Sequence, residues 1–311
     1  MKIVLPNTMP LDPTLPEGCT AVIVDAAQPI PSEHTDAEVL VVWGGSSAYV
    51  ESAARTMPRL RLVQSLSAGV DKIVAAGFSS DVIIASGSGL HDKTVTEHTL
   101  ALLLTLVRRI PEVIEAQKRH DWSEELGGLQ PLHPEDRTTT LLGARVLIWG
   151  FGGIAKTLAP LLTALGATVT GVARSAGTRD GYRVVSEQEI AEELPTTDVL
   201  ISILPDTEAT REVINAEIFA ALPRHAFMVN VGRGAVVDQT ALIAALTNGT
   251  IAGAAIDVTT PEPLPADSPL WETPRLLITP HAAGGRPVGA NERIEKNVRA
   301  LLAEEDVLHR V

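Results

Sequence analysis

Short apolar runs alternate along the chain with segments in which apolar residues recur every three or four positions. Within residues 1–93, two segments have this helical spacing, YVESAARTM and GVDKIVAAG. The apolar runs around them have the length and composition of strands buried on both faces, as in a parallel sheet. These runs are KIVLP, AVIVD, VLVVW, LRLVQS and VIIAS. The alternation predicts a small α/β domain.

A long helical pattern follows, TVTEHTLALLLTLVRRIPEVIEAQKRH, in which Pro111 is expected to kink or interrupt the helix. Thr94 and Glu97 stand three apart, as in a capping box. A polar loop runs from about Asp121 to Thr140, and after it the alternation of strands and helices resumes. The chain ends in a charged amphipathic helix. This second series predicts a doubly wound sheet that binds its ligand at the carboxyl ends of its strands.

The stretch VLIWGFGGIAKTLA joins a short strand to a helix through a glycine turn. Gly150 permits the tight turn, and Gly152 lets the backbone approach a pyrophosphate. The N–H groups at the start of the helix then face the phosphates. A glycine turn without a nucleotide is the alternative, but the order of strand, turn and helix favours a dinucleotide site.

The next strand, ATVTGVARS, ends in Ala173, Arg174 and Ser175, where NAD-binding sites carry an Asp or Glu for the ribose hydroxyls. A carboxylate would repel a 2′-phosphate, whereas Arg174 can pair with one and Ser175 can donate a hydrogen bond to it. An ordinary solvated loop arginine is the alternative. We predict NADP(H) as the preferred cofactor, ahead of NAD(H).

Composition narrows the class of protein. The length of 311 residues suggests two domains, and a formal charge of −13 argues against nucleic acid or an anionic membrane as a partner. The single cysteine, Cys19, excludes an internal disulfide and suits a reducing compartment. Met1 leads into a strand-like segment without a signal-peptide layout, and the longest apolar run falls far short of the ~20 residues of a membrane span. A soluble cytoplasmic protein is expected.

Polar residues follow several predicted strands beyond the glycine turn: Arg233 in NVGRGAVVD, Asp257 and Glu262 in IDVTTPEPLP, and His281 in ITPHAAGG. These strand ends would meet at the edge that holds the pyrophosphate. A guanidinium can hold a carboxylate and polarise a carbonyl, a histidine can give or take a hydroxyl proton, and a carboxylate can orient the histidine ring. The alternatives are a surface arginine, a solvated glutamate and a structural histidine. The other histidines lack metal-ligand spacing, so no metal site is predicted, and His98 is expected to pack within a helix.

Together these stretches resemble the D-isomer-specific 2-hydroxyacid dehydrogenase family over nearly the whole chain. The order and spacing of the last three motifs are more specific than the glycine turn. The motifs are SAGVD at 67–71, TEHTLALLL at 96–104, GFGGIA at 150–155, NVGRGAVVD at 230–238, AAIDVTTPEPLP at 254–265 and TPHAAG at 279–284.

The resemblance implies that Arg233, Glu262 and His281 are the catalytic residues of an oxidoreductase that reduces a 2-keto acid to the D-2-hydroxy acid. His281 would be the general acid, Glu262 would raise its proton affinity, and Arg233 would bind the substrate carboxylate and carbonyl. Backbone N–H groups of Ser67, Ala68 and Gly69 would also bind the carboxylate. The implied cofactor contacts are Gly153 and Ile154 at the pyrophosphate, Pro205 at the adenosine, Asp257 at the nicotinamide carboxamide, and Val231, Gly232, Arg233, His281 and Gly284 along the cofactor.

The resemblance further implies a Rossmann cofactor domain over residues 94–284 and a smaller flavodoxin-like substrate domain formed by residues 1–93 and 285–311. Similar enzymes close the cleft between these domains on substrate, and they are usually homodimers paired through the cofactor domains. Neither Trp43–Ser46 nor Ser67–Gly69 contains Lys or Arg. A phosphorylated substrate would need cations there, so a small unphosphorylated 2-keto acid such as glyoxylate or hydroxypyruvate is expected. Trp43 would instead favour a bulkier apolar side chain.

A binding protein that senses dinucleotides is the rival interpretation, because corepressors of this family keep the fold and the same three residues. The chain has no basic tail and no terminal extension for such a partner, which favours the enzyme.

Overall fold

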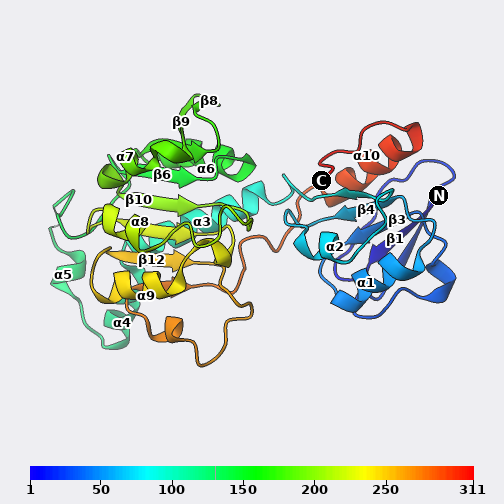
Figure 1. Cartoon of the computed structure of the whole chain (residues 1–311). Coiled ribbons are helices and arrows are strands. Elements are labelled where there is room, and N and C mark those ends of the chain that lie inside the picture. The colour runs from blue at the N-terminus through cyan, green and yellow to red at the C-terminus, as the bar shows by residue number, and fades with distance from the viewer. Residues whose placement is uncertain (130) are drawn as a thin grey trace. The chain divides into compact units, whose positions relative to one another are not determined.

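The computed structural model describes residues 1–129 and 131–311. The chain divides into two compact units, Met1–His91 with Arg286–Val311, and Asp92–Gly285. We call them the first and the second unit (Figure 1). Both are built on largely parallel sheets, so the predicted α/β fold class is confirmed. Among the described helices, none combines the length and the apolar character needed to cross a bilayer.

The first unit is a five-stranded parallel sheet in the order β2-β1-β3-β4-β5, which is the flavodoxin-like order. Helix α10 packs its apolar side chains on one face, and α1 and α2 cover the other. The elements are β1 Lys2–Pro6, β2 Thr20–Val24, η1 Ser32–His34, β3 Val39–Val42, α1 Ser47–Thr56, β4 Leu62–Ser65, α2 Asp71–Ala75, β5 Ile83–Ala85 and α10 Ala290–Ala303.

One strand of the first unit differs from its prediction. The run AVIVD was expected to be buried on both faces, but β2 lies at one edge of the sheet, and Ile23 within it is 65% exposed. An edge strand pairs on one side only, so an apolar run does not by itself predict burial there.

The second unit is an eight-stranded sheet in the order β13-β12-β11-β10-β6-β7-β9-β8. Read across the sheet, the six strands β9-β7-β6-β10-β11-β12 have the doubly wound order, with β6 as the first strand of the fold. Among the strand pairs of the described residues in this sheet, only β8–β9 is antiparallel. The elements are α3 Asp92–Val107, α4 Ile110–Lys118, α5 Glu124–Gly127, β6 Arg145–Trp149, α6 Gly153–Ala164, β7 Thr168–Ala173, β8 Gly177–Arg179, β9 Tyr182–Ser186, η2 Glu187–Glu189, α7 Ile190–Glu193, η3 Leu194–Thr196, β10 Val199–Ser202, α8 Ala216–Ala221, β11 Phe227–Asn230, η4 Gly234–Val236, α9 Gln239–Thr247, β12 Gly253–Ile256, η5 Pro269–Glu272 and β13 Leu276–Ile278.

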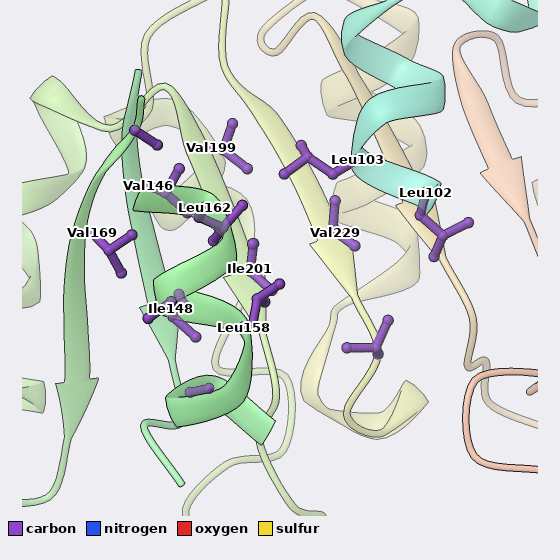
Figure 2. Close-up of a cluster of buried hydrophobic side chains, with 14 of the residues drawn as sticks. Leu102, Leu103, Val146, Ile148, Leu158, Leu162, Val169, Val199, Ile201 and Val229 are labelled. Carbon is purple, nitrogen blue, oxygen red and sulfur yellow. The ribbon is translucent and has the colours of Figure 1, made fainter. Parts of the chain in front are cut away.

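The core of the second unit lies on both faces of this sheet. On one face, Leu158 and Leu162 of α6 pack on Ile148 and Ile201, and Leu102 and Leu103 of α3 extend the same cluster (Figure 2). Helices α7, α8 and α9 form the cluster on the other face. Because helices cover both faces, the sheet is open at the ends of its strands, where the connecting loops lie.

The long helical pattern is two helices. Helix α3 ends at Val107, and α4 begins after Arg109, whose φ of 54° is left-handed. Pro111 lies in the first turn of α4, where its missing N–H is not needed. Because α3 begins at Asp92, Thr94 lies inside the helix, and the predicted capping box is wrong.

The β8–β9 hairpin was not predicted. Its turn is Asp180-Gly181, with φ of 50° and 84° at the two residues. Asp-Gly between two short strands is a strong hairpin signal, because the turn needs positive φ at both central positions. Three residues separate the hairpin from the end of β7.

Candidate active site

The glycine turn leaves open space at the start of α6. Gly150 has a φ of 100°, and a Cβ built on it would lie 2.7 Å from the Ile203 carbonyl oxygen. Gly152 is the N-cap of α6, and a Cβ on it would meet nothing within 4 Å. A Cβ on Gly153 would lie 2.3 Å from Asp92 Oδ2, so the Asp92 carboxylate would have to move to admit a side chain there. The open side of the turn is thus at Gly152, next to Gly153 and Ile154, the residues predicted from the sequence to bind a pyrophosphate through their N–H groups.

The end of β7 lies beside this turn, because β6 and β7 are neighbours in the sheet. Arg174 and Ser175 follow the last residue of β7, and both are exposed. Pro205, after β10 on the other side of β6, is exposed as well. Arg174, Ser175 and Pro205 thus follow the two strands that flank β6 in the sheet, and they are the residues predicted from the sequence to bind the adenosine end of the cofactor.

The segment that carries Arg233 has little freedom. A Cβ on Gly232 would lie 2.5 Å from the Leu204 carbonyl oxygen, and one on Gly234 would lie 2.1 Å from the Thr259 carbonyl group. The buried Asn230 accepts a hydrogen bond from the Gly232 N–H at 3.1 Å and donates one to the Arg233 carbonyl at 3.0 Å. The half-buried Arg233 side chain therefore projects from a fixed backbone, with Nη1 donating to the Gly232 carbonyl at 2.8 Å.

His281 and Glu262 are in direct contact. His281 Nδ1 lies 2.8 Å from Glu262 Oε2, and the other carboxylate oxygen accepts from the Thr259 N–H at 3.1 Å. A carboxylate only accepts hydrogen bonds, so Nδ1 carries the hydrogen and Nε2 faces away from this contact. The His281 side chain is 47% exposed, so a small molecule can reach it. Its φ of 51° is left-handed, and such backbone strain concentrates at functional sites.

Asp257 fixes the loop on which His281 lies. Its carboxylate is 1% exposed and accepts from Thr279 Oγ1 at 2.6 Å and from the N–H groups of Ala282 and Ala283 at 2.8 and 3.0 Å. The Asp257 carbonyl also accepts from the His281 N–H at 2.7 Å. The carboxylate is thus used within the protein, and it sets the backbone on both sides of His281.

His98 also contacts Asp257 and Thr279, and its sequence pattern did not indicate these contacts. Its Nε2 lies 3.0 Å from Thr279 Oγ1 and 3.2 Å from Asp257 Oδ1. It was expected only to pack within a helix. The motif TEHTLALLL was the one available signal, because it places His98 on α3, which packs near β11 and β12.

The remaining predicted residues fall in two places. Val231, buried, follows β11, and the half-buried Gly284 closes the His281 loop, both in the second unit. Ser67, Ala68 and Gly69 follow β4 in the first unit, where Ser65 Oγ accepts from the Ser67 N–H at 3.0 Å. In the described parts of the chain, no acceptor takes a hydrogen bond from the Ala68 or Gly69 N–H. This loop is the one predicted from the sequence to bind the substrate carboxylate.

Comparison with known proteins identifies the family. The sequence model of the D-isomer specific 2-hydroxyacid dehydrogenase NAD binding domain matches residues 100–283. Glyoxylate/hydroxypyruvate reductase A of Serratia proteamaculans is 31% identical over 282 residues, which cover 88% of this chain and 85% of the reductase.

Solved structures agree in fold. A D-isomer specific 2-hydroxyacid dehydrogenase of Xanthobacter autotrophicus, in complex with NADPH and MES, has a TM-score of 0.81 at 30% identity and covers 100% of this chain and 97% of its own. An NADPH-dependent glyoxylate/hydroxypyruvate reductase of Sinorhizobium meliloti, in complex with NADP and sulfate, has a TM-score of 0.81 at 25% identity with the same coverage. Relatives named as reductases favour an oxidoreductase over a corepressor-like binding protein. With the family model matching more than half of the 311 residues, the chain belongs to the D-isomer specific 2-hydroxyacid dehydrogenases, a family of NAD(P)-dependent oxidoreductases.

Proposed function

We propose that this enzyme reduces a small unphosphorylated 2-keto acid to the D-2-hydroxy acid with NADPH, and that His281 donates the proton. The observation that supports this most directly is the contact of 2.8 Å between His281 Nδ1 and Glu262 Oε2. It fixes one ring nitrogen and leaves the other, Nε2, available to a substrate oxygen.

Each residue has one task in this proposal. When bound, NADPH would supply the hydride for the carbonyl carbon of the keto acid. His281 Nε2 gives its proton to the carbonyl oxygen, and Glu262 holds the ring in orientation. Arg233 pairs with the substrate carboxylate and polarises the carbonyl.

The preference for NADPH rests on the end of β7. Ala173 replaces the carboxylate that would bind ribose hydroxyls, and the exposed Arg174 and Ser175 can bind a 2′-phosphate. Two structural neighbours are complexes with NADPH or NADP. We expect Arg174→Ala to raise KM for NADPH by at least about tenfold and to leave KM for NADH nearly unchanged. A wild-type enzyme with a clear preference for NADH would contradict the cofactor assignment.

The substrate is proposed to be glyoxylate or hydroxypyruvate. The loop Trp43–Ser46 has no cation for a phosphate group, and the half-buried Trp43 ring stacks on His91 with ring centroids 5.4 Å apart. Relatives of this chain at 31% and 35% identity are named glyoxylate/hydroxypyruvate reductases. The test is NADPH oxidation, followed at 340 nm, with a panel that includes glyoxylate, hydroxypyruvate, pyruvate, a branched 2-keto acid and a phosphorylated one. Turnover of none of them would refute the proposed reaction.

We also propose a homodimer formed through the second unit. Helix α4 exposes Ile110, Val113 and Ile114 at 39–45%, and Trp122 is 96% exposed just beyond it. Large apolar side chains grouped in this way are characteristic of an interface. Light scattering should give twice the chain mass of 32.9 kDa for the wild type and a lower mass for Ile114→Asp. A monomeric wild type would refute this part.

A further inference from the structure

The β8–β9 hairpin is fastened to the glycine turn. Arg179 Nη1 donates to the Phe151 carbonyl at 3.3 Å, and the rings of Phe151 and Tyr182 are in contact with centroids 6.0 Å apart. Lys156 of α6 pairs with Asp180 at the tip of the hairpin, with 2.9 Å between Nζ and Oδ2. The hairpin lies at the β7 side of the sheet (Figure 1). Its position is therefore set by the same turn that receives the pyrophosphate.

Arg179 also holds the residue that follows Arg174. Its Nη2 donates to the Ser175 carbonyl at 3.1 Å and to Ser175 Oγ at 3.2 Å. One half-buried guanidinium thus connects the glycine turn to the end of β7. These are the two places that a dinucleotide with a 2′-phosphate would touch at once.

The direction of the hydrogen bond to Ser175 has a chemical consequence. A serine hydroxyl has one hydrogen to donate and lone pairs to accept with. Because the Arg179 guanidinium only donates, Ser175 Oγ must accept from it, and the hydroxyl hydrogen points elsewhere. That hydrogen is available to an anionic oxygen. A phosphate oxygen bound by Ser175 would also lie within about 6 Å of the guanidinium, where opposite charges attract appreciably.

We propose that Arg179 is a specificity-determining residue for the 2′-phosphate of NADPH, acting through Ser175. By donating to Ser175 Oγ, Arg179 leaves the Ser175 hydroxyl hydrogen to be donated to a phosphate oxygen, and its guanidinium adds a positive charge close to that phosphate. NADH carries a neutral hydroxyl in place of the phosphate and gains little from either effect. This inference rests on the proposed preference for NADPH.

The test compares Arg179→Gln with Arg183→Gln by calorimetric binding of 2′,5′-ADP and 5′-AMP. Arg183 is a matched control, because it lies on the same hairpin but is 62% exposed and pairs with Glu193 at 2.7 Å. Arg179→Gln should weaken 2′,5′-ADP binding by about tenfold and change 5′-AMP binding by less than about twofold. Arg183→Gln should change neither. An equal loss for both nucleotides, or no loss for 2′,5′-ADP, would overturn the proposal.

Two further variants test the route through Ser175. Arg179→Lys keeps the charge but cannot span the acceptors on Phe151 and Ser175, so its loss for 2′,5′-ADP should be smaller than that of the Gln variant. In a Ser175→Ala background, Arg179→Gln should cost less than about threefold, since most of its effect needs the hydroxyl. A full tenfold loss in that background would overturn the route. If the wild type binds 2′,5′-ADP and 5′-AMP equally well, the proposed preference for NADPH is refuted. If the wild type prefers 2′,5′-ADP and Arg179→Gln keeps the same preference, only the proposed role of Arg179 is refuted.

Discussion

Replacing Glu262 by Gln tests the histidine–carboxylate contact without changing the size of the side chain. In the wild type, the two carboxylate oxygens accept from two different N–H groups, those of Thr259 and His281 Nδ1. A Gln amide has one acceptor oxygen, and its NH₂ group would face an N–H donor at the second place. The variant therefore loses one of the two hydrogen bonds or displaces the His281 ring.

The size of the effect follows from the exposure of the pair. A hydrogen bond to a charged group contributes about 1.5–3 kcal/mol, and exposed ion pairs contribute less. With side chains that are 47% and 38% exposed, we expect a loss of about 1–2 kcal/mol, which is about a 5–30-fold decrease in kcat/KM. Glu262→Ala removes both acceptors and should decrease kcat/KM further.

The assay is steady-state oxidation of NADPH with the best keto acid of the panel. Glu272→Gln is the control, because Glu272 is an exposed glutamate of the same unit in the helix η5. It should have the wild-type kcat/KM. Wild-type activity in both Glu262 variants would show that the His281 contact does not matter for the reaction.

Two other predictions concern the second unit. Gly234→Ala would put a Cβ 2.1 Å from the Thr259 carbonyl and should lower the free energy of unfolding by about 2–3 kcal/mol. A Cβ on Gly152 would meet nothing within 4 Å, so Gly152→Ala should keep the melting temperature of the wild type but weaken NADPH binding. An equal loss of stability in both variants would contradict this prediction. Burial raises the pKa of Asp198, but hydrogen bonds from Arg145 and His225 outweigh it, so the pKa of this carboxyl lies below its usual value. The charged form is then stabilising above the unfolded-state pKa of about 3.9, and the contribution is lost as pH falls through the lower folded-state pKa. Asp198→Asn should therefore cost about 2 kcal/mol at pH 7 and progressively less below pH 4, as measured by urea unfolding, and a pH-independent difference would refute the assignment.

Much of the fold could be predicted from the sequence, because buried parallel strands are continuous apolar runs and the glycine turn has a distinct order of elements. The exposed edge strand β2 shows the limit of that reasoning, since an apolar run does not say how many neighbours its strand has. The hairpin at residues 177–186 was missed although Asp180-Gly181 was a readable turn signal.

The site was harder to predict than the fold. Arg233, Glu262 and His281 could be selected by residue type and place after strands, but the contact between His281 and Glu262 depends on loop conformations that no periodicity encodes. The same holds for His98, whose helical position did not reveal that its ring faces Thr279 and Asp257. Arg179 escaped notice because its partners, Phe151 and Ser175, lie on other elements.

The central claim is that His281 supplies the proton, and His281→Asn tests it most directly. Asn tolerates the left-handed φ of 51° at this position, so the loop should keep its shape without a proton donor of suitable strength. We predict a decrease in kcat of about 10²–10⁴-fold with NADPH affinity unchanged. A kcat close to that of the wild type, with NADPH still bound normally, would contradict the claim.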